Sequence, residues 1–152
     1  MTRCHVSISV DSPDITEGEP IPTRYTCDGE DVSPPLRWSG IQQDAAALAL
    51  VVDDPDAPRG TFTHWVVVDI DPGVTSLARG QSPQGAQQIA NSAGRASYMG
   101  PCPPSGVHRY RFTVYALSRR LALPARASLQ SALDAIGAAA TAQGRLVGTY
   151  RR

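Results

Sequence analysis

Residues 46–70 read AALALVVDDPDAPRGTFTHWVVVDI, a stretch in which two apolar segments flank an acidic, proline-containing connection. The segments 46–52 and 64–70 each have the length of a strand, and their almost continuous apolar character predicts burial on both faces. Each proline of the connection fixes its own φ and removes a backbone donor. The stretch therefore predicts two buried strands joined by a stiff loop.

Alternating apolar residues predict further strands on both sides of this stretch. Valines and an isoleucine alternate with serines in residues 6–10, and residues 108–117 alternate apolar or aromatic side chains with polar ones. Alternation of this kind is typical of a strand with one buried face. A further short strand is expected at 145–150. Residues 71–104 are rich in Gly, Gln, Ser and Pro and show no clear periodicity, which is typical of a long functional or mobile loop.

The same alternation assigns faces to the two histidines that begin strands. His108 shares the apolar face of its strand. His64 falls in register with Val66 and Val68, so Trp65 is expected on the opposite face.

One helix is expected near the C-terminus. Ser128 is a suitable N-cap, and Gly144 stands where a C-terminal cap would. Apolar residues recur at helical spacing at Leu129, Leu133, Ile136 and Ala140. Since strands do not alternate with helices, we expect one mainly β domain over residues 1–152, with antiparallel sheets packed face to face and this helix at the periphery.

Composition narrows the class of protein. The chain has 152 residues and a formal net charge of zero, without the clustered Lys and Arg that a nucleic-acid partner requires. The N-terminus lacks an apolar signal-peptide core, and the longest apolar run, 45–52, is far shorter than the ~20 residues of a membrane span. These features predict a soluble, cytoplasmic protein without stable membrane insertion.

The three cysteines, Cys4, Cys27 and Cys102, have no Cys-x-x-Cys spacing. Neither a zinc knuckle nor a closed disulfide framework is indicated. Reduced thiols are the favoured interpretation, and a single Cys4–Cys27 or Cys27–Cys102 bridge is the alternative.

Two segments carry the residues suited to chemistry. The run 53–58, DDPDAP, precedes His64, and the run 100–104, GPCPP, precedes His108. A buried imidazole needs a hydrogen-bond partner, and Asp54 could supply it, which would raise the imidazole pKa and favour a bound anion. Asp56 is interpreted as a turn-forming residue that bonds its own loop.

The order of the motifs resembles one protein family. IPTRYTCDGEDVSPPL at residues 21–36 is followed by DPDAP, HWVVVDI, GPCPP, HRYRFTVYAL and LVGTY. Together they are similar to the phosphatidylethanolamine-binding protein (PEBP) family, in particular its bacterial and archaeal YbhB/YbcL-like branch, from about Val10 to Tyr150. The resemblance implies a PEBP-like fold, in which a central antiparallel sheet packs on a smaller second sheet beside a peripheral C-terminal helix.

The resemblance also implies an anion pocket at one end of the central sheet. Carried over residue by residue, its ligand-binding residues are Asp54, Pro58, Phe62, His64, Gly100, Pro101, His108 and Tyr110. His64 and His108 would donate N–H bonds to anion oxygens, and Gly100 would let a backbone N–H approach closely. Asp54 would orient an imidazole or bind an amine, and no metal or cofactor is needed.

The leading interpretation is a non-enzymatic binding protein. Its ligand would be phosphate, a phosphorylated headgroup such as phosphorylethanolamine, or a carboxylate. Binding could regulate a protein partner, a kinase or a protease, and a homodimer is one option for the oligomeric state. Neither nucleic acid nor a membrane-inserted state is expected.

Three other functions stay open at the level of the sequence. A kinase- or protease-inhibitor-like interaction protein is the first. A metal-dependent hydrolase using His64, His108 and Asp54 is the second, because two histidines and a carboxylate can form a divalent metal site. Nucleophilic catalysis by Cys102 or Ser105 beside His108 is the third, and it requires a free, activated nucleophile.

Overall fold

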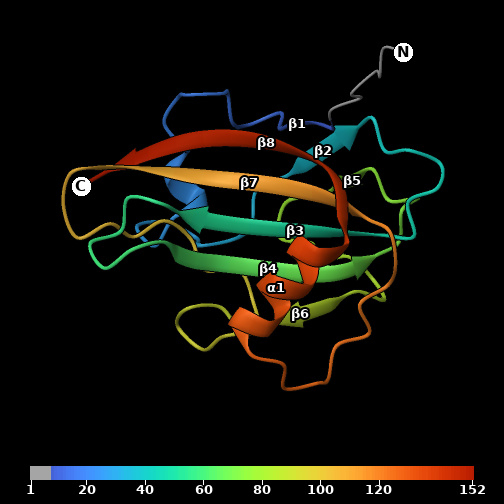
Figure 1. The fold of residues 1–152 in the computed structure, drawn as a ribbon. Coiled ribbons are helices and arrows are strands. Elements are labelled where there is room, and N and C mark those ends of the chain that lie inside the picture. Colours follow the sequence, from blue (N-terminus) through green and yellow to red (C-terminus); the bar gives the residue numbers. More distant parts are fainter. Residues whose placement is uncertain (1–7) are drawn as a thin grey trace, which may run out of the picture.

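The computed structural model describes residues 8–152, and most of its regular structure is β-strand (Figure 1). Its strands are β1 (Ser9–Asp11), β2 (Leu36–Ser39), β3 (Ala47–Asp54), β4 (Phe62–Ile70), β5 (Ser76–Leu77), β6 (Gln87–Ile89), β7 (Val107–Leu117) and β8 (Ala140–Arg151). A short 3₁₀ helix, η1, spans Thr23–Tyr25, and the α-helix α1 spans Leu129–Ala139. The first two residues of the expected strand at 6–10 lie outside the described residues, and its described part overlaps β1 at Ser9 and Val10.

The strands form two antiparallel sheets. A sheet of three strands has the order β1-β2-β5, and a sheet of five has the order β6-β4-β3-β7-β8 (Figure 1). The mainly β fold, the smaller second sheet and the peripheral helix are thus confirmed. The stretch 71–104 carries two short strands, β5 and β6, which its composition did not reveal.

The core has two parts because β3 and β4 are buried on both faces. Leu48, Leu50 and Val52 of β3 point toward the small sheet, where they join a cluster that contains Trp38. Ala47 and Ala49 face the other way and pack in a second cluster with α1. Small side chains there let the helix approach the sheet, and each large aliphatic residue in the core contributes about 1.5–3 kcal/mol through burial.

The helix begins as expected and ends earlier. Ser128 Oγ accepts a hydrogen bond of 3.1 Å from the backbone N–H of Ser131, so the predicted N-cap is confirmed. The prediction that Gly144 caps the C-terminus is wrong, because Ala140 is already extended and begins β8. Pairing with β7 along its length stabilises β8. This tertiary stabilisation outweighs the local preference of these residues for a helix.

Gly144 has a packing role instead. It lies in β8 opposite Val114, and a Cβ at this position would come within 1.8 Å of the carbonyl oxygen of Ile8. The glycine therefore permits two backbones to approach closely, which is a common reason for glycine inside a strand.

The pairing of the cysteines also differs from the prediction. Cys27 and Cys102 form a disulfide across a sequence separation of 75 residues, so the expectation of reduced thiols is wrong for these two. Cys4 lies outside the described residues. The alternative of a Cys27–Cys102 bridge is the one the structure contains.

Candidate functional site

A β-bulge determines where His64 points. Val52 of β3 pairs with Trp65, whereas the next residue, Asp53, pairs with Thr63, so His64 is an extra residue in β4. The bulge interrupts the alternation, and the predicted register of His64 with Val66 and Val68 is wrong: the two valines pack in the cluster that contains α1. Trp65 lies in the cluster between the sheets, on the same side as His64. Bulges often re-aim a side chain beside a functional site in this way.

The re-aimed histidine lines a cavity of about 190 Å³. The end of β3, the start of β4 and the start of β7 meet there, at one end of the large sheet, with segment 99–104 across from them. The lining residues are Asp54, Ala57, Pro58, Phe62, His64, Met99, Cys102, Pro103, Pro104, His108 and Tyr110. Six of the eight residues expected in the pocket are therefore brought together, and Gly100 and Pro101 are not among the lining residues.

At the base of the cavity, His108 and Asp54 form a buried pair. His108 Nδ1 lies 2.6 Å from Asp54 Oδ2, and both side chains are less than a tenth exposed. The other carboxylate oxygen, Asp54 Oδ1, accepts the backbone N–H of Asp56 at 2.7 Å. Asp54 thus lies where it can orient an imidazole, as expected, and the imidazole is that of His108.

The prediction that Asp56 bonds its own loop is wrong, because its carboxylate pairs with Arg109 of β7 and the bond within the loop is accepted by Asp54. The Asp56 carboxylate accepts bonds from the backbone N–H and the guanidinium of Arg109 at 2.8–2.9 Å. These hydrogen bonds lower the pKa of Asp56 to about 2. The residue thus ties the loop after β3 to β7 at the protein surface.

His64 is held by a backbone carbonyl. Its Nδ1 lies 2.7 Å from the carbonyl oxygen of Met99. Because a carbonyl only accepts, Nδ1 carries the hydrogen and donates it. Burial lowers the pKa of His64, more than the Met99 carbonyl and the charge of Asp54 raise it. The ring is therefore favoured in its neutral form, and the predicted role of N–H donor to an anion does not apply to that form.

Aromatic rings surround the two histidines. The His64 ring packs edge-on against Phe62 and Tyr110, with centroid distances of 4.9 and 5.5 Å, and the His108 ring stacks on Tyr110 at 6.4 Å. Burial, and after it the negative charge of Asp54, raises the pKa of Tyr110. The Tyr110 hydroxyl consequently keeps its hydrogen at neutral pH.

Gly100 and Pro101 have roles behind the cavity wall. The Gly100 N–H, expected to approach a ligand, donates instead to Asp31 Oδ1 at 2.7 Å. A Cβ on Gly100 would lie 2.4 Å from the carbonyl oxygen of Tyr25, so only glycine fits. The Pro101 carbonyl accepts the backbone N–H of Cys27 at 3.1 Å. Both residues thus dock the wall segment on the chain around η1.

Sequence reasoning missed Asp31 and Asn91, which support this wall. Asn91 is buried and donates through Nδ2 to the carbonyl oxygens of His64 and Ser97, at 2.9 and 3.1 Å. No local pattern identifies these contacts, because the partners of Asp31 and His64 lie 69 and 27 residues away.

Two of the alternative functions lose their structural basis. Cys102 is in the disulfide and therefore lacks the free thiol that a nucleophile needs, and Ser105 is exposed and does not line the cavity. Within residues 8–152, no group of three or more His, Cys, Asp or Glu side chains has an arrangement that could hold a metal ion. His64, His108 and Asp54 therefore do not form the expected ligand set.

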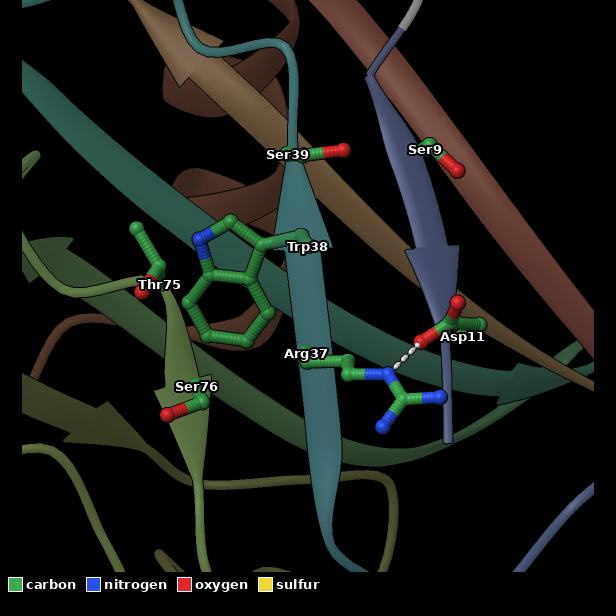
Figure 2. Close-up of a pocket in the computed structure, with 7 residues that line it drawn as sticks. All are labelled: Ser9, Asp11, Arg37, Trp38, Ser39, Thr75 and Ser76. Atoms are coloured by element: carbon green, nitrogen blue, oxygen red, sulfur yellow. Dashed lines mark hydrogen bonds and ion pairs between the residues drawn. The ribbon is translucent and has the colours of Figure 1, made fainter. Parts of the chain in front are cut away.

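A second hollow, of about 420 Å³, lies on the small sheet across β1, β2 and β5 (Figure 2). It contains no histidine, and its two charged residues, Arg37 and Asp11, are exposed and paired with each other. The Trp38 Nε1–H donates to the carbonyl oxygen of Val74 at 2.9 Å. This hollow is larger than the histidine cavity, but its charges and the indole already have partners, so we assign the candidate site to the histidine cavity.

The lowered pKa of His64 predicts a pH effect on stability. The unfolded chain binds a proton to this ring below about pH 6.5, whereas the folded protein resists doing so, and stability therefore falls as the pH drops through that region. Thermal unfolding followed from about pH 7.5 to about pH 5.5 should show a smaller decline for His64→Gln than for the wild type. Equal declines in the two proteins would show that His64 does not contribute to the pH dependence of stability.

Comparisons with known proteins agree with the fold and the motifs. The family model described as "Phosphatidylethanolamine-binding protein" matches residues 11–151. A protein of Mycobacterium tuberculosis named "Putative lipoprotein LppC" is 50% identical over 145 residues, which cover 94% of this chain and 72% of that protein. A UPF0098 protein of Methanothermobacter thermautotrophicus is 48% identical over 137 residues, which cover 87% of this chain and 91% of that protein.

Solved structures show the same architecture. The PEBP homologue CT736 of Chlamydia trachomatis superimposes with a TM-score of 0.90 at 36% identity, covering 97% of this chain and 99% of the other. YbcL of E. coli, described as a member of the mammalian PEBP family, gives a TM-score of 0.90 at 31% identity, covering 96% and 99%. In the described part of the chain, no helix is both long and apolar enough to cross a membrane.

Proposed function

Because the chain belongs to the phosphatidylethanolamine-binding protein family, we propose that it binds a small anion in the His64–His108 cavity and catalyses no reaction. The ligand class is phosphate, a phosphorylated headgroup or a carboxylate. The observation that carries the proposal is the buried His108–Asp54 pair, which opens into a cavity of about 190 Å³.

The pair suits an anion for electrostatic reasons. Asp54 accepts the Nδ1 hydrogen of His108, so protonation of the ring leaves its Nε2–H as a charged donor to the ligand. Asp54 then balances the charge of the imidazolium, and Tyr110 lines the same cavity. The aromatic and proline residues of the rim exclude water, which strengthens these bonds.

The size and rim of the cavity fit a small ligand. Its volume is below the usual range for drug-sized ligands and is sufficient for a phosphate or a short phosphorylated group. Phe62, Met99 and the prolines at 58, 103 and 104 form a largely apolar rim. A ligand with a charged head and a short uncharged substituent would match both the polar interior of the cavity and its apolar rim.

We add three further proposals that only the family resemblance supports. They are regulation of a kinase or protease partner, an inhibitor-like role, and a homodimer. The neutral net charge continues to argue against nucleic acid. The expected cytoplasmic location stays a prediction, and the Cys27–Cys102 disulfide argues against it, because disulfides persist mainly in oxidising compartments.

Calorimetric titration with inorganic phosphate at about pH 6.5 tests the anion site. Removing the His108 donor should weaken binding by about tenfold or more in His108→Ala and His108→Gln, because a charge-assisted hydrogen bond is lost. Arg37→Ala, in the hollow of the small sheet, is the matched control and should bind like the wild type. Undiminished binding by both His108 variants, or loss of binding in the Arg37 variant, would place the anion elsewhere.

A further inference from the structure

The Cys27–Cys102 disulfide lies at the protein surface. Both cysteines are exposed, and the buried prolines at 101 and 103 flank Cys102. Cys102 lines the histidine cavity, whereas Cys27 is not among its lining residues. A disulfide is cleaved when a thiolate attacks one of its sulfurs, and exposed disulfides are the more labile ones. A thiol in solution can therefore reach this bridge without unfolding the protein.

One cation contacts the bridge on the Cys102 side. Arg152 Nη1 lies 3.5 Å from Cys102 Sγ, and Arg152 Nη2 donates to Asp28 Oδ1 at 2.9 Å. Two backbone hydrogen bonds with Gly106, of 2.9 and 3.2 Å, hold Arg152 in this place. A neighbouring cation stabilises a thiolate relative to a thiol. Negative charge that develops on Cys102 is therefore stabilised.

The surroundings of Cys27 have the opposite sign. Asp28 follows Cys27 in the chain, and its carboxylate accepts from the Tyr150 hydroxyl at 2.7 Å as well as from Arg152. A carboxylate beside a thiolate disfavours the charged form. In thiol exchange, the sulfur that is the more stable anion leaves faster, and the other sulfur receives the incoming thiol. The charges around the bridge thus favour Cys102 as the leaving group.

We propose that the Cys27–Cys102 bridge is a thiol-exchange site, which takes a low-molecular-weight thiol on Cys27 and releases Cys102 as a thiolate. The thiolate of the incoming compound attacks Cys27 Sγ and forms a new S–S bond there. The Cys27–Cys102 bond breaks, and its electron pair stays on Cys102 Sγ. One disulfide replaces another, so no further oxidant or reductant is needed. This chemistry goes beyond the proposed anion binding and does not depend on it.

Exchange at the bridge acts on the cavity wall. The bridge cross-links segment 99–104 to the chain around η1. Once it is exchanged, hydrogen bonds remain, such as that of 3.1 Å from the Cys27 N–H to the Pro101 carbonyl. Met99, in the same segment, accepts the Nδ1 hydrogen of His64. A thiol on Cys27 therefore loosens the wall that positions His64.

Peptide mapping identifies the sulfur that receives the thiol. Free thiols, Cys4 included, are first alkylated with one maleimide. The protein is then treated briefly with 2-mercaptoethanol at about pH 7.5, and a second maleimide of different mass stops the reaction. Cleavage after arginine separates Cys27, in peptide 25–37, from Cys102, in peptide 96–109. We expect 2-mercaptoethanol on Cys27 and the second maleimide on Cys102. The reverse placement, or no reaction of the folded protein, would refute the proposal.

Arg152→Gln tests the role of the cation, and Arg151→Gln is the matched control. Arg151 is an exposed neighbour in β8, and within residues 8–152 no side-chain hydrogen bond joins it to the bridge. Arg152→Gln should react with 2-mercaptoethanol about threefold or more slowly than the wild type, because Cys102 becomes a poorer leaving group. Arg151→Gln should react at the wild-type rate. Equal rates in all three proteins would refute the role of Arg152.

Salt provides a second check on the cation. The Arg152 side chain is 43% exposed, so dissolved ions can screen its charge. The rate difference between the wild type and Arg152→Gln should shrink toward one at about 1 M salt. A difference that persists undiminished would mean that the arginine acts through packing and not through its charge.

Hydrogen exchange tests the link to the wall. Amides of segment 99–104 should lose protection in the trapped adduct and in the fully reduced protein, in which no label occupies Cys102. Amides of α1, which packs in the other core cluster, are the internal control and should not change. Unchanged protection of segment 99–104 would refute the link to the cavity. Neither readout requires a bound anion, so failure of the proposed function would leave this test intact.

Discussion

Replacing Asp54 with alanine is expected to lower the free energy of unfolding by about 2–5 kcal/mol, the usual cost of leaving two buried hydrogen-bond donors unpaired. The substitution leaves the Nδ1–H of His108 and the backbone N–H of Asp56 without the carboxylate that accepts both. For a chain of this length the melting temperature should fall by roughly 10 °C. Phosphate binding should also weaken, because His108 loses the group that orients it and balances its charge.

Asp56 provides the matched control two residues away. Its carboxylate pairs with Arg109, whose side chain is 61% exposed, so Asp56→Ala should cost only about 1 kcal/mol or less. Asp54→Asn keeps an oxygen that can accept from His108 and should lie between the two alanine variants. Urea unfolding of all three variants provides the comparison. Equal losses in the free energy of unfolding for Asp54→Ala and Asp56→Ala would show that the His108–Asp54 pair stabilises the protein no more than the exposed Arg109–Asp56 pair does.

Loss of the Cys27–Cys102 disulfide is expected to destabilise the protein by about 2–5 kcal/mol. The bridge spans a separation of 75 residues, and the chain-entropy model assigns a larger effect to longer loops. Cys102 also lines the cavity, so loosening segment 99–104 should move the wall away from the histidines. The Cys27→Ser/Cys102→Ser double variant should therefore lose both thermal stability and phosphate affinity.

Reductant supplies the control for this second prediction. The wild type should lose stability when a reductant is added, whereas the double variant should have the same melting temperature with and without it. A wild-type melting temperature that does not respond to full reduction would mean that the hydrogen bonds of Gly100 and Pro101 hold the wall without the disulfide.

Much of the fold was predictable because its signals are local. The apolar runs at 46–52 and 64–70 predicted the two central strands, and the alternation over 108–117 placed His108 and Tyr110 on the cavity side. Ser128 predicted the start of α1 for the same reason, since an N-cap acts within one turn of helix.

The site was predictable only in part. The motif order assigned Asp54, His64 and His108 to one pocket, and all three line the same cavity. It did not reveal that the Gly100 N–H bonds Asp31, because that contact joins segments 69 residues apart. The lining residues Ala57, Pro103 and Pro104 were also not assigned to the pocket.

The sequence by itself determined which segments become strands and which side chains are suited to hold an anion, because periodicity and residue type are properties of neighbouring residues. Only the tertiary structure decided the rest. Pairing with β3 created the bulge that turns His64 into the cavity, and pairing with β7 ended the helix at Ala139. The Met99 carbonyl, 35 residues from His64, fixed which nitrogen of that ring carries the hydrogen. Such contacts depend on partners distant in sequence, so no local pattern could have specified them.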